Sequence, residues 1–246
     1  NQIQLDIPEG KTYMSLDQLT MLNILASTGF SRPICFTSPY AEIGFGPYLR
    51  QEGIIYHLVP VKTDNGRYFD VNKTANLLQT QFRGGNANIP GVYFDEENRR
   101  HLLTIRQVFA QTASSLADQG RKPEAINVLN RSEQLVSPAD MPYAMVSRGN
   151  FHNRVTMFYL QAAYKSGDTP LAQKLNAALK NDLNDQKAYY NYLKNYKDEF
   201  YAQLADEDQD CDQMLKMLEQ LEKTYNGSNV PAKETPGQMR DSAAKP

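Results

Sequence analysis

Three histidines are the first residues that could do chemistry, because imidazole changes its charge near neutral pH. They are His57, His101 and His152. His57 lies in an apolar run typical of a strand, and the other two lie in helical stretches. None stands at a metal-ligand spacing such as HxxxH or HExxH. We therefore expect all three to be structural or surface residues, and the sequence predicts no metal site.

Aspartates alternate with other residues from Asp206 to Asp212, a spacing that first suggests a calcium loop. An EF-hand loop counted from Asp206 needs glycine at its sixth position and glutamate at its twelfth. Cys211 and Met217 stand there instead. Capping and the helix dipole explain acidic residues at the start of a helix. We expect these aspartates to begin the last helix.

The segment Gly44-Phe45-Gly46 could begin a phosphate-binding loop. The third glycine of GxGxxG is replaced by Leu49, however, and no Lys-Ser/Thr pair follows. No GxSxG motif, catalytic carboxylate pair or Cys/His pair can be assigned either. The sequence therefore predicts no catalytic residue and no cofactor.

Two cysteines, Cys35 and Cys211, are too few for a disulfide scaffold and too far apart for a CxxC motif. Nothing in their spacing brings the two thiols together. We expect both to be free, with burial in the core as the usual location of such residues.

Aromatic residues gather between Tyr189 and Tyr201. On one continuous helix, Tyr189, Tyr192, Tyr196 and Phe200 would form a single stripe, as core residues usually do. Tyr190 and Tyr201 would point elsewhere. We therefore expect Tyr190 and Tyr201 to be exposed anchors for a partner polypeptide, and Tyr192 and Tyr196 to be packed.

Strand and helix signals are mixed over residues 1–95, so we expect a small α+β or α/β domain with a short mixed or parallel sheet. Ser15 and Gly29 would begin and end the first helix. The strands at 33–37 and 54–61 would be parallel and joined by a short right-handed crossover. The full set of expected elements comprises strands at 3–7, 33–37 and 54–61, helical segments at 15–29, 47–52 and 71–82, and a turn at 64–66.

Residues 96–225 have helical periodicity throughout, which predicts an all-α domain with breaks near Gly120, Ser137-Pro138, Gly167 and 204–206. One set of positions recurs after 47 residues: Leu116, Gly120, Ala125 and Leu129 correspond to Ala163, Gly167, Ala172 and Asn176. This pattern resembles the tetratricopeptide (TPR) helix-turn-helix, with an insertion near 141–150. Residues 226–246 contain three prolines and few large apolar residues, so we expect a disordered tail.

The overall composition is that of a globular protein, with 246 residues, 41% hydrophobic and 22% charged. The formal net charge of −2 argues against a nucleic-acid partner, which needs an excess of lysine and arginine. No apolar run is long enough to cross a membrane.

Three linked motifs resemble the C-terminal soluble region of a bacterial family of multi-spanning membrane proteins of unknown function. The membrane half of that family is similar to protein O-mannosyltransferases of the GT-C class. The motifs are an RPICF segment after Ser31, the segment 48–61 (YLRQEGIIYHLVPV), and DEENRR from Asp95. The positions that match the family pattern, with no role assigned, are Arg32, Pro33, Tyr48, Glu52, Gly53, Tyr56, Pro60, Asn98, Arg99 and Arg100. Cys35 and His57 depart from it, where the family has an aromatic residue and an arginine.

The resemblance implies a fragment cut from a larger chain, with a membrane-embedded part upstream and this domain on the periplasmic or extracytoplasmic side of a bacterial inner membrane. The domain would then be an accessory that binds or positions an acceptor or partner protein, while any glycosyltransferase site lies upstream. Two alternatives stay open: a self-contained enzyme with a site between the α/β and helical parts, and a purely structural domain.

Overall fold

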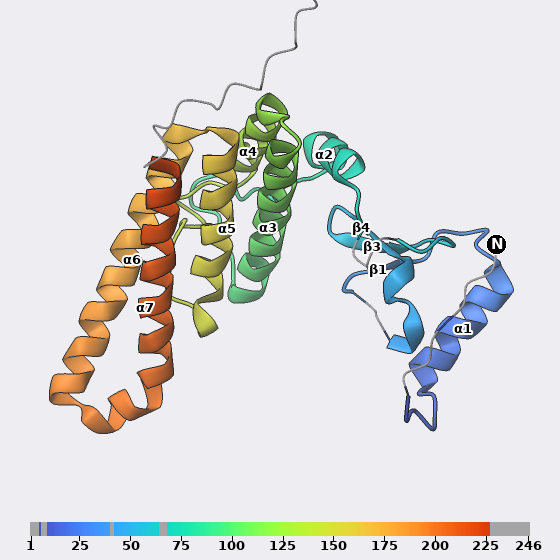
Figure 1. Cartoon of the computed structure of the whole chain (residues 1–246), viewed down its shortest axis with the longest axis horizontal. Coiled ribbons are helices and arrows are strands. Elements are labelled where there is room, and N and C mark those ends of the chain that lie inside the picture. The colour runs from blue at the N-terminus through green and yellow to red at the C-terminus, as the bar shows by residue number, and fades with distance from the viewer. Residues whose placement is uncertain (1–4, 6–8, 40–41, 64–67, 227–246) are drawn as a thin grey trace, which may run out of the picture.

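The computed structural model of the chain describes residues 5, 9–39, 42–63 and 68–226, and consists of a small sheet with one covering helix, followed by a larger helical part (Figure 1). The fold class expected from the sequence is therefore confirmed. The predicted strand at 3–7, except Leu5, the turn at 64–66 and the tail after Asn226 lie outside the described residues.

Helix α1 spans Leu16–Thr28 and has the ends that its sequence predicts. The Ser15 backbone N–H donates to Gln18 Oε1 at 3.2 Å in a capping box, and Gly29 ends the helix at φ +51°. Only part of its apolar surface is covered, since Leu16 remains 81% exposed. The helix therefore contacts the sheet with one face and leaves a second apolar face open.

The sheet has four short strands, β1 (Cys35–Phe36), β2 (Leu49–Glu52), β3 (Ile55–Leu58) and β4 (Tyr68–Phe69), in the order β1-β3-β2-β4. Strands β2 and β3 form an antiparallel hairpin, β1 pairs antiparallel with β3, and β4 pairs parallel with β2. The short helices η1 (Glu42–Gly44) and η2 (Gly46–Tyr48) lead into β2.

The predicted parallel crossover between the strands at 33–37 and 54–61 is wrong, because those strands pair antiparallel. The predicted helical segment at 47–52 is also wrong beyond Tyr48, since Leu49–Glu52 forms β2. Gly53, at φ +65°, supplies the left-handed conformation that lets β2 turn directly into β3. A tight hairpin therefore replaces the crossover.

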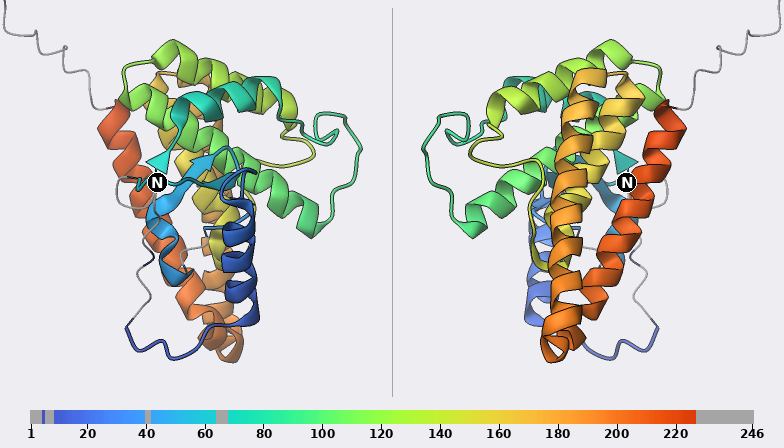
Figure 2. Two further views of the ribbon diagram at one scale, coloured as in Figure 1. Left: turned by 90° about the vertical axis from the view of Figure 1, so that its right-hand side faces the viewer. Right: turned by 90° about the vertical axis from the view of Figure 1, so that its left-hand side faces the viewer.

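The helical part contains α2 (Val71–Thr80), α3 (Glu96–Asp118), α4 (Lys122–Leu135), α5 (Phe151–Ser166), α6 (Thr169–Tyr196) and α7 (Asp198–Asn226), with the short turn η4 (Arg148–Asn150) before α5. Helix α5 packs against α3 and α6, α4 packs mainly against α3, and α7 packs along α6 and touches α5 (Figure 1). The sheet and α1 lie beside these layers, with α2 between the two parts (Figure 1), so that in the two side views they overlap the helices (Figure 2).

The repeated positions occupy equivalent places in two helical hairpins, α3–α4 and α5–α6. Gly120 and Gly167 take positive φ values of +79° and +84° at the turns, and Ala125 and Ala172 are fully buried where the second helix of each pair packs on the first. Asn176, the one polar member, donates to Glu222 Oε1 at 2.6 Å. The predicted insertion forms the connection between α4 and α5.

Two predicted helix ends in the C-terminal region are wrong. The chain is helical straight through 204–206, so the last helix begins at Asp198, and the helix carrying the tyrosines ends at Tyr196. The reversal at Lys197 lets α7 pack along α6, where it buries Cys211, Met214 and Leu218. The stability gained by this burial exceeds what residues 189–201 would gain by continuing as one uninterrupted helix.

The buried apolar residues form two separate clusters. One, which we call the N-terminal cluster, lies between α1 and the sheet and contains Ile43, Phe45, Tyr48, Leu49 and Leu58. The other extends through the helical part and includes Leu78 of α2 and Ala87. Helix α2 therefore packs with the helices, although the division into domains at 1–95 and 96–225 stays a prediction.

No helix within the described part of the chain is long and apolar enough to cross a lipid bilayer.

Candidate functional site

The three histidines make separate local contacts. His57 Nδ1 is 3.3 Å from Glu52 Oε1, and His101 lies on the surface 3.5 Å from Glu97. His152 is buried, with Nε2 2.7 Å from the Pro142 carbonyl oxygen. No group of three or more His, Cys, Asp or Glu side chains among the described residues could hold a metal ion.

Both cysteines are free, as the sequence predicts, but Cys35 is exposed and only Cys211 is buried. Burial raises the pKa of the Cys211 thiol to about 11. Burial, and then the negative charge of Glu52, also raise the pKa of Cys35 above its ordinary value. Both thiols are protonated at neutral pH, which is unfavourable for a nucleophile.

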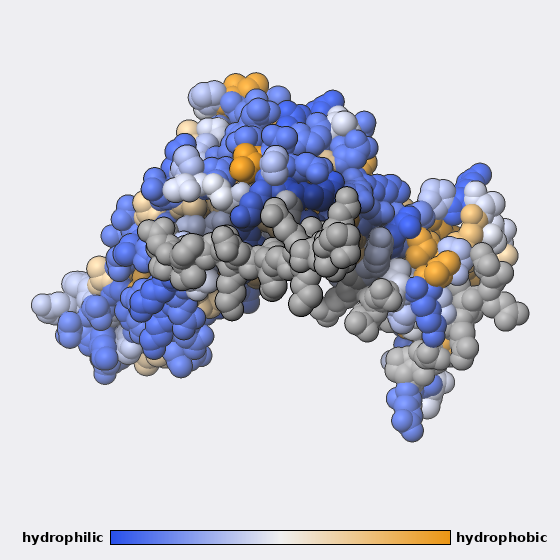
Figure 3. All heavy atoms as spheres, turned by 45° about the horizontal axis from the view of Figure 1, so that its top comes forward, coloured by the Kyte–Doolittle hydropathy of each residue, from blue (hydrophilic) through white to orange (hydrophobic). Residues whose placement is uncertain are grey.

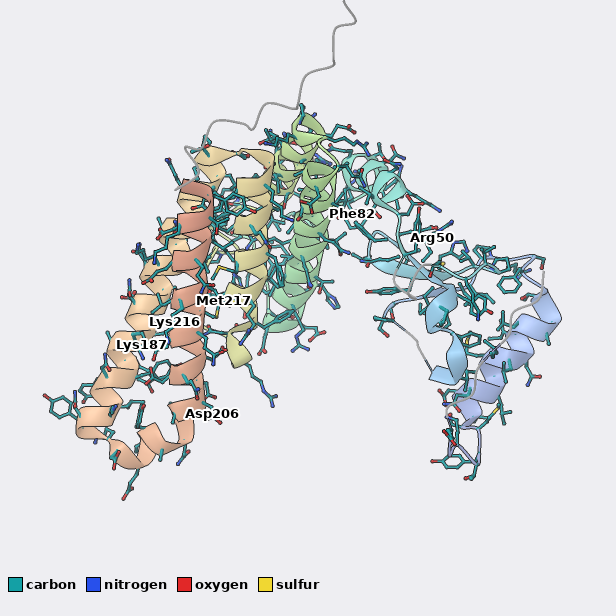
Figure 4. All side chains as sticks on the ribbon, viewed as in Figure 1. Arg50, Phe82, Lys187, Asp206, Lys216 and Met217 are labelled. Atoms are coloured by element: carbon teal, nitrogen blue, oxygen red, sulfur yellow. The ribbon has the colours of Figure 1, made fainter. Side chains whose placement is uncertain are left out.

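The alternating aspartates of α7 do not converge on one point. Asp208 and Asp212 both pair with Lys187 of α6, the latter at 2.9 Å, and Asp210 pairs with Arg154 of α5. Figure 4 places Asp206 apart from Lys187, lower on α7. These side chains tie α7 to its two neighbours rather than forming a calcium loop.

The phosphate-loop interpretation fails as well, because the Phe45 side chain is completely buried in the N-terminal cluster. Gly44 instead provides a positive φ of +83° at the end of η1. The glycine pair therefore shapes a packed turn.

Glu52 is the centre of a charged cluster that joins the sheet to α2. Its side chain is 4% exposed, and Oε1 lies 2.5 Å from Arg50 Nη2 and 3.3 Å from His57 Nδ1. Lys73 of α2 pairs with the other carboxylate oxygen. Burial would raise the pKa of Glu52, but hydrogen bonds from Lys73, Arg50 and His57 outweigh it and lower that pKa. The negative charge of Glu52 is therefore balanced by its neighbours, and its pKa is lowered rather than raised as a general base at neutral pH would require.

The next residue, Gly53, adds a second link to α2. Its N–H donates to Thr74 Oγ1 at 2.9 Å, and a Cβ placed on it would lie 3.3 Å from the Phe82 ring. Figure 4 shows Arg50 and Phe82 at this junction between the sheet and the helices. Glu52 and Gly53, two of the positions that match the resembled motif, thus sit at the connection of the two parts.

The other motif positions are spread over four places, three of them in the N-terminal part. Arg32 and Pro33 are exposed in the bend before β1, and Pro60 is half-buried after β3. Tyr48 is buried in the N-terminal cluster, and Tyr56 packs against it.

The DEENRR motif forms the start of α3. The Asn98 N–H donates to Asp95 Oδ1 at 2.8 Å, which caps the helix. Arg99 Nε donates to the Phe94 carbonyl at 2.8 Å, and Arg100 pairs with Glu97 at 3.2 Å. The described contacts of this motif are those of a helix N-terminus.

The orientation predicted for the tyrosines is reversed. Tyr190, expected to be an exposed anchor, is 6% exposed, whereas Tyr192 and Tyr196, expected to be packed, are 53% and 71% exposed. Tyr201 lies on α7, is half-buried and donates to Asp208 Oδ2 at 3.0 Å. Tyr190 lies on the side of α6 that packs against α7. The predicted stripe containing Tyr192 and Tyr196 lies on another side of α6 and therefore faces solvent.

The structure offers a different candidate, a groove of about 390 Å³ between α5 and α7, which we call the α5–α7 groove. Its apolar lining comes from Met157, Phe158, Met214, Met217, Leu221 and Tyr225. Met157 and Met214 are buried and form its base, whereas Phe158 and Met217 are 57% and 48% exposed. Figure 4 labels Met217 on α7, beside α5.

Polar side chains border this apolar lining. Gln161 lies on the α5 side, Gln220 and Thr224 on the α7 side, and Arg154 is held by its pair with Asp210. Most of the surface seen in Figure 3 is hydrophilic, so apolar residues exposed together are the exception on that face. An apolar floor with polar borders is suited to binding rather than to bond-breaking chemistry.

Sequence reasoning missed this groove, although a local signal existed on each helix. Arg154, Met157, Phe158 and Gln161 follow the i, i+3, i+4, i+7 spacing of one helix face. What the spacing does not reveal is that α5 and α7, distant in sequence, leave that face partly open.

Comparison with known proteins matches the N-terminal half of the chain to a family model. Residues 1–121 match the family model described as TMEM260-associated domain 2, which spans the sheet, α1, α2 and α3. The match fits an accessory domain of a TMEM260-like membrane protein family. No curated protein and no solved structure matches the chain.

Proposed function

We propose that this chain is an extracytoplasmic accessory domain of a membrane protein, and that it binds an apolar segment of a partner polypeptide in the α5–α7 groove. The observation that carries the proposal is the exposure of Phe158 and Met217 above the buried base of that groove. Exposed apolar side chains grouped in a concavity mark binding sites in folded proteins.

The chemistry of the groove favours a polypeptide as occupant. Methionine side chains are flexible and polarizable, so they adapt to apolar side chains of different shapes. Gln161 and Gln220 at the borders can donate to or accept from a main chain while its side chains enter the apolar floor. The groove also runs along two helices, as helix-in-groove and peptide-in-groove sites do.

The family match and the resembled motifs support a role beside a membrane-embedded partner. In this proposal the parent is a multi-spanning bacterial protein of the glycosyltransferase-like kind, and the domain positions an acceptor protein. Any sugar transfer belongs to the membrane-embedded part of the parent.

Selection from a displayed random peptide library on the full chain tests the proposal. We expect enriched peptides to carry apolar anchors and to lose about tenfold or more in affinity for Phe158→Asp or Met217→Asp. Ile89→Asp is the matched control, because Ile89 is 49% exposed and lies outside the groove. Enriched peptides that bind the groove variants as tightly as the unchanged protein, or no enrichment at all, would contradict the proposal.

A further inference from the structure

A second groove lies between α2 and α4, with a volume of about 630 Å³, and its walls are built from side-chain amides. We call it the amide groove. The amides are Asn72, Asn76 and Gln79 on α2, and Asn127, Asn130 and Gln134 on α4. Buried Leu116 and Val128 form its floor. In Figure 3, hydrophilic residues dominate the end of the helical part where α2 and α4 lie.

The amides are regularly spaced along both helices. Asn72 and Asn76 are four residues apart, as are Asn130 and Gln134. Four residues of helix rise about 6 Å, and two residues of an extended strand span about 6.6 Å. Successive amides on one wall can therefore meet alternate residues of an extended chain. The oxygens of Asn72 and Gln134 already accept from Arg121 and Arg131, so these two residues would take part through their amide N–H groups.

One end of the groove is already closed by hydrogen bonds. Arg121 Nη1 donates to Asn72 Oδ1 at 2.6 Å, and the same guanidinium pairs with Glu124 at 2.6 Å. These contacts bridge α2 and α4 and fix the distance between the two walls at this end.

Further along the groove, hydrogen-bonding groups stay open. The side-chain amides of Asn76, Gln79, Asn127 and Asn130 make no hydrogen bond with other described residues, and all four residues are exposed. Arg131 Nε is buried, and no acceptor from the described part of the chain reaches it. A ligand that both donates and accepts at regular intervals would satisfy these groups.

We infer that the amide groove binds an extended polypeptide through its main chain, with little dependence on side-chain sequence. A main chain supplies one N–H and one C=O per residue, which is the pairing that a carboxamide offers. Oligosaccharides also donate and accept, but no aromatic ring for stacking is found among the described residues that line the groove. This site is separate from the α5–α7 groove and does not depend on it.

The test measures fluorescence polarization of a labelled, unstructured peptide of alternating alanine and serine, titrated with the full chain. Peptide N-methylated at alternate residues keeps the side chains but loses half of the main-chain donors. We expect N-methylation to weaken binding about tenfold or more. Asn76→Ala combined with Asn130→Ala should weaken the unmodified peptide to a similar extent, with N-methylation then adding little.

Two controls separate this site from others. Asn191→Ala with Asn195→Ala removes an exposed pair at the same spacing on α6, outside the groove, and should leave the affinity unchanged. Met217→Asp should also leave it unchanged, which distinguishes this site from the α5–α7 groove. Alanine favours the helix, so the asparagine variants should stay folded, as circular dichroism would verify.

The inference is overturned if the unmodified peptide does not bind, if the N-methylated peptide binds equally well, or if the α6 control loses as much affinity. It is likewise overturned if a chitin trisaccharide binds the groove and the peptide does not compete with it.

Discussion

Glu52 shows how a buried charge can join two parts of a protein. The carboxylate is almost inaccessible to water, yet three cationic or protonatable groups from β2, β3 and α2 reach it. Without Glu52, these partly buried groups would lose the negative charge that offsets the cost of removing them from water. The motif position therefore has a structural role that is independent of catalysis.

We expect Glu52→Gln to reduce the free energy of unfolding by about 1 to 3 kcal/mol at neutral pH. Because the pKa of Glu52 is lowered in the folded state, its contribution is present above the ordinary carboxyl pKa. That contribution is lost as the pH falls through the lowered value. Urea unfolding at about pH 7 and about pH 3 should therefore show a smaller acid loss in the variant. Glu97→Gln, on the surface, is the control and should change neither value much.

His152 gives an independent prediction in a higher pH range. Burial lowers its pKa below the ordinary value, although its hydrogen bond to Pro142 acts in the opposite direction. The unfolded chain then binds the proton more readily, so stability should fall as the pH drops below about 6.5. Comparing urea unfolding at about pH 7.5 and about pH 5.5 should show a smaller difference in His152→Gln. An unchanged difference in that variant, or an equal effect from exposed His101→Gln, would contradict the assignment.

At the scale of elements, Gly84 marks a close approach between the chain after α2 and the end of α4. A Cβ on Gly84 would lie 2.1 Å from the Leu135 carbonyl oxygen, which is backbone and cannot rotate away. In the sequence, Gly84 and Gly85 simply follow the helical segment predicted at 71–82. The close contact explains why the first of them must lack a side chain.

Gly84→Ala should therefore destabilise the protein by several kcal/mol, because backbone segments must separate. Gly85→Ala is the matched control: Gly85 has φ +58° but open space around its Cβ position, so strain of about 1 kcal/mol is expected. Thermal unfolding followed by circular dichroism would rank the two. Equal losses of stability in the two variants would show that backbone conformation, rather than the close contact with Leu135, sets the cost of a side chain at both positions.

Many of the elements could be predicted from local signals. Ser15 and Gly29 give the ends of α1, and Gly120 and Gly167 give the turns of two hairpins. The failures arise where tertiary contacts decide. Lys197 interrupts a run with helical periodicity because α7 buries its own apolar face on α6. Leu49–Glu52 forms a strand because pairing with β3 and β4 satisfies its backbone.

At the scale of the whole molecule, the candidate site could not be predicted because it belongs to no single segment. The α5–α7 groove needs helices that are far apart in sequence, and the amide groove needs α2 to pack beside α4. The same limit explains the reversed tyrosines: the spacing identified a stripe containing Tyr192 and Tyr196, but only the packing determines which stripe is covered.

The two hydrophobic clusters predict how the whole chain unfolds. The N-terminal cluster is small and connects to the helices mainly through polar contacts of Glu52 and Gly53 with α2. We therefore expect calorimetry to resolve two transitions, with the N-terminal part unfolding first. Leu58→Ala, in the smaller cluster, should lower the first transition, and Leu160→Ala, in the larger one, should lower the second. Each truncation should remove about 2 to 5 kcal/mol from its own cluster. A single transition that both variants shift equally would mean that the contacts with α2 make the chain one cooperative unit.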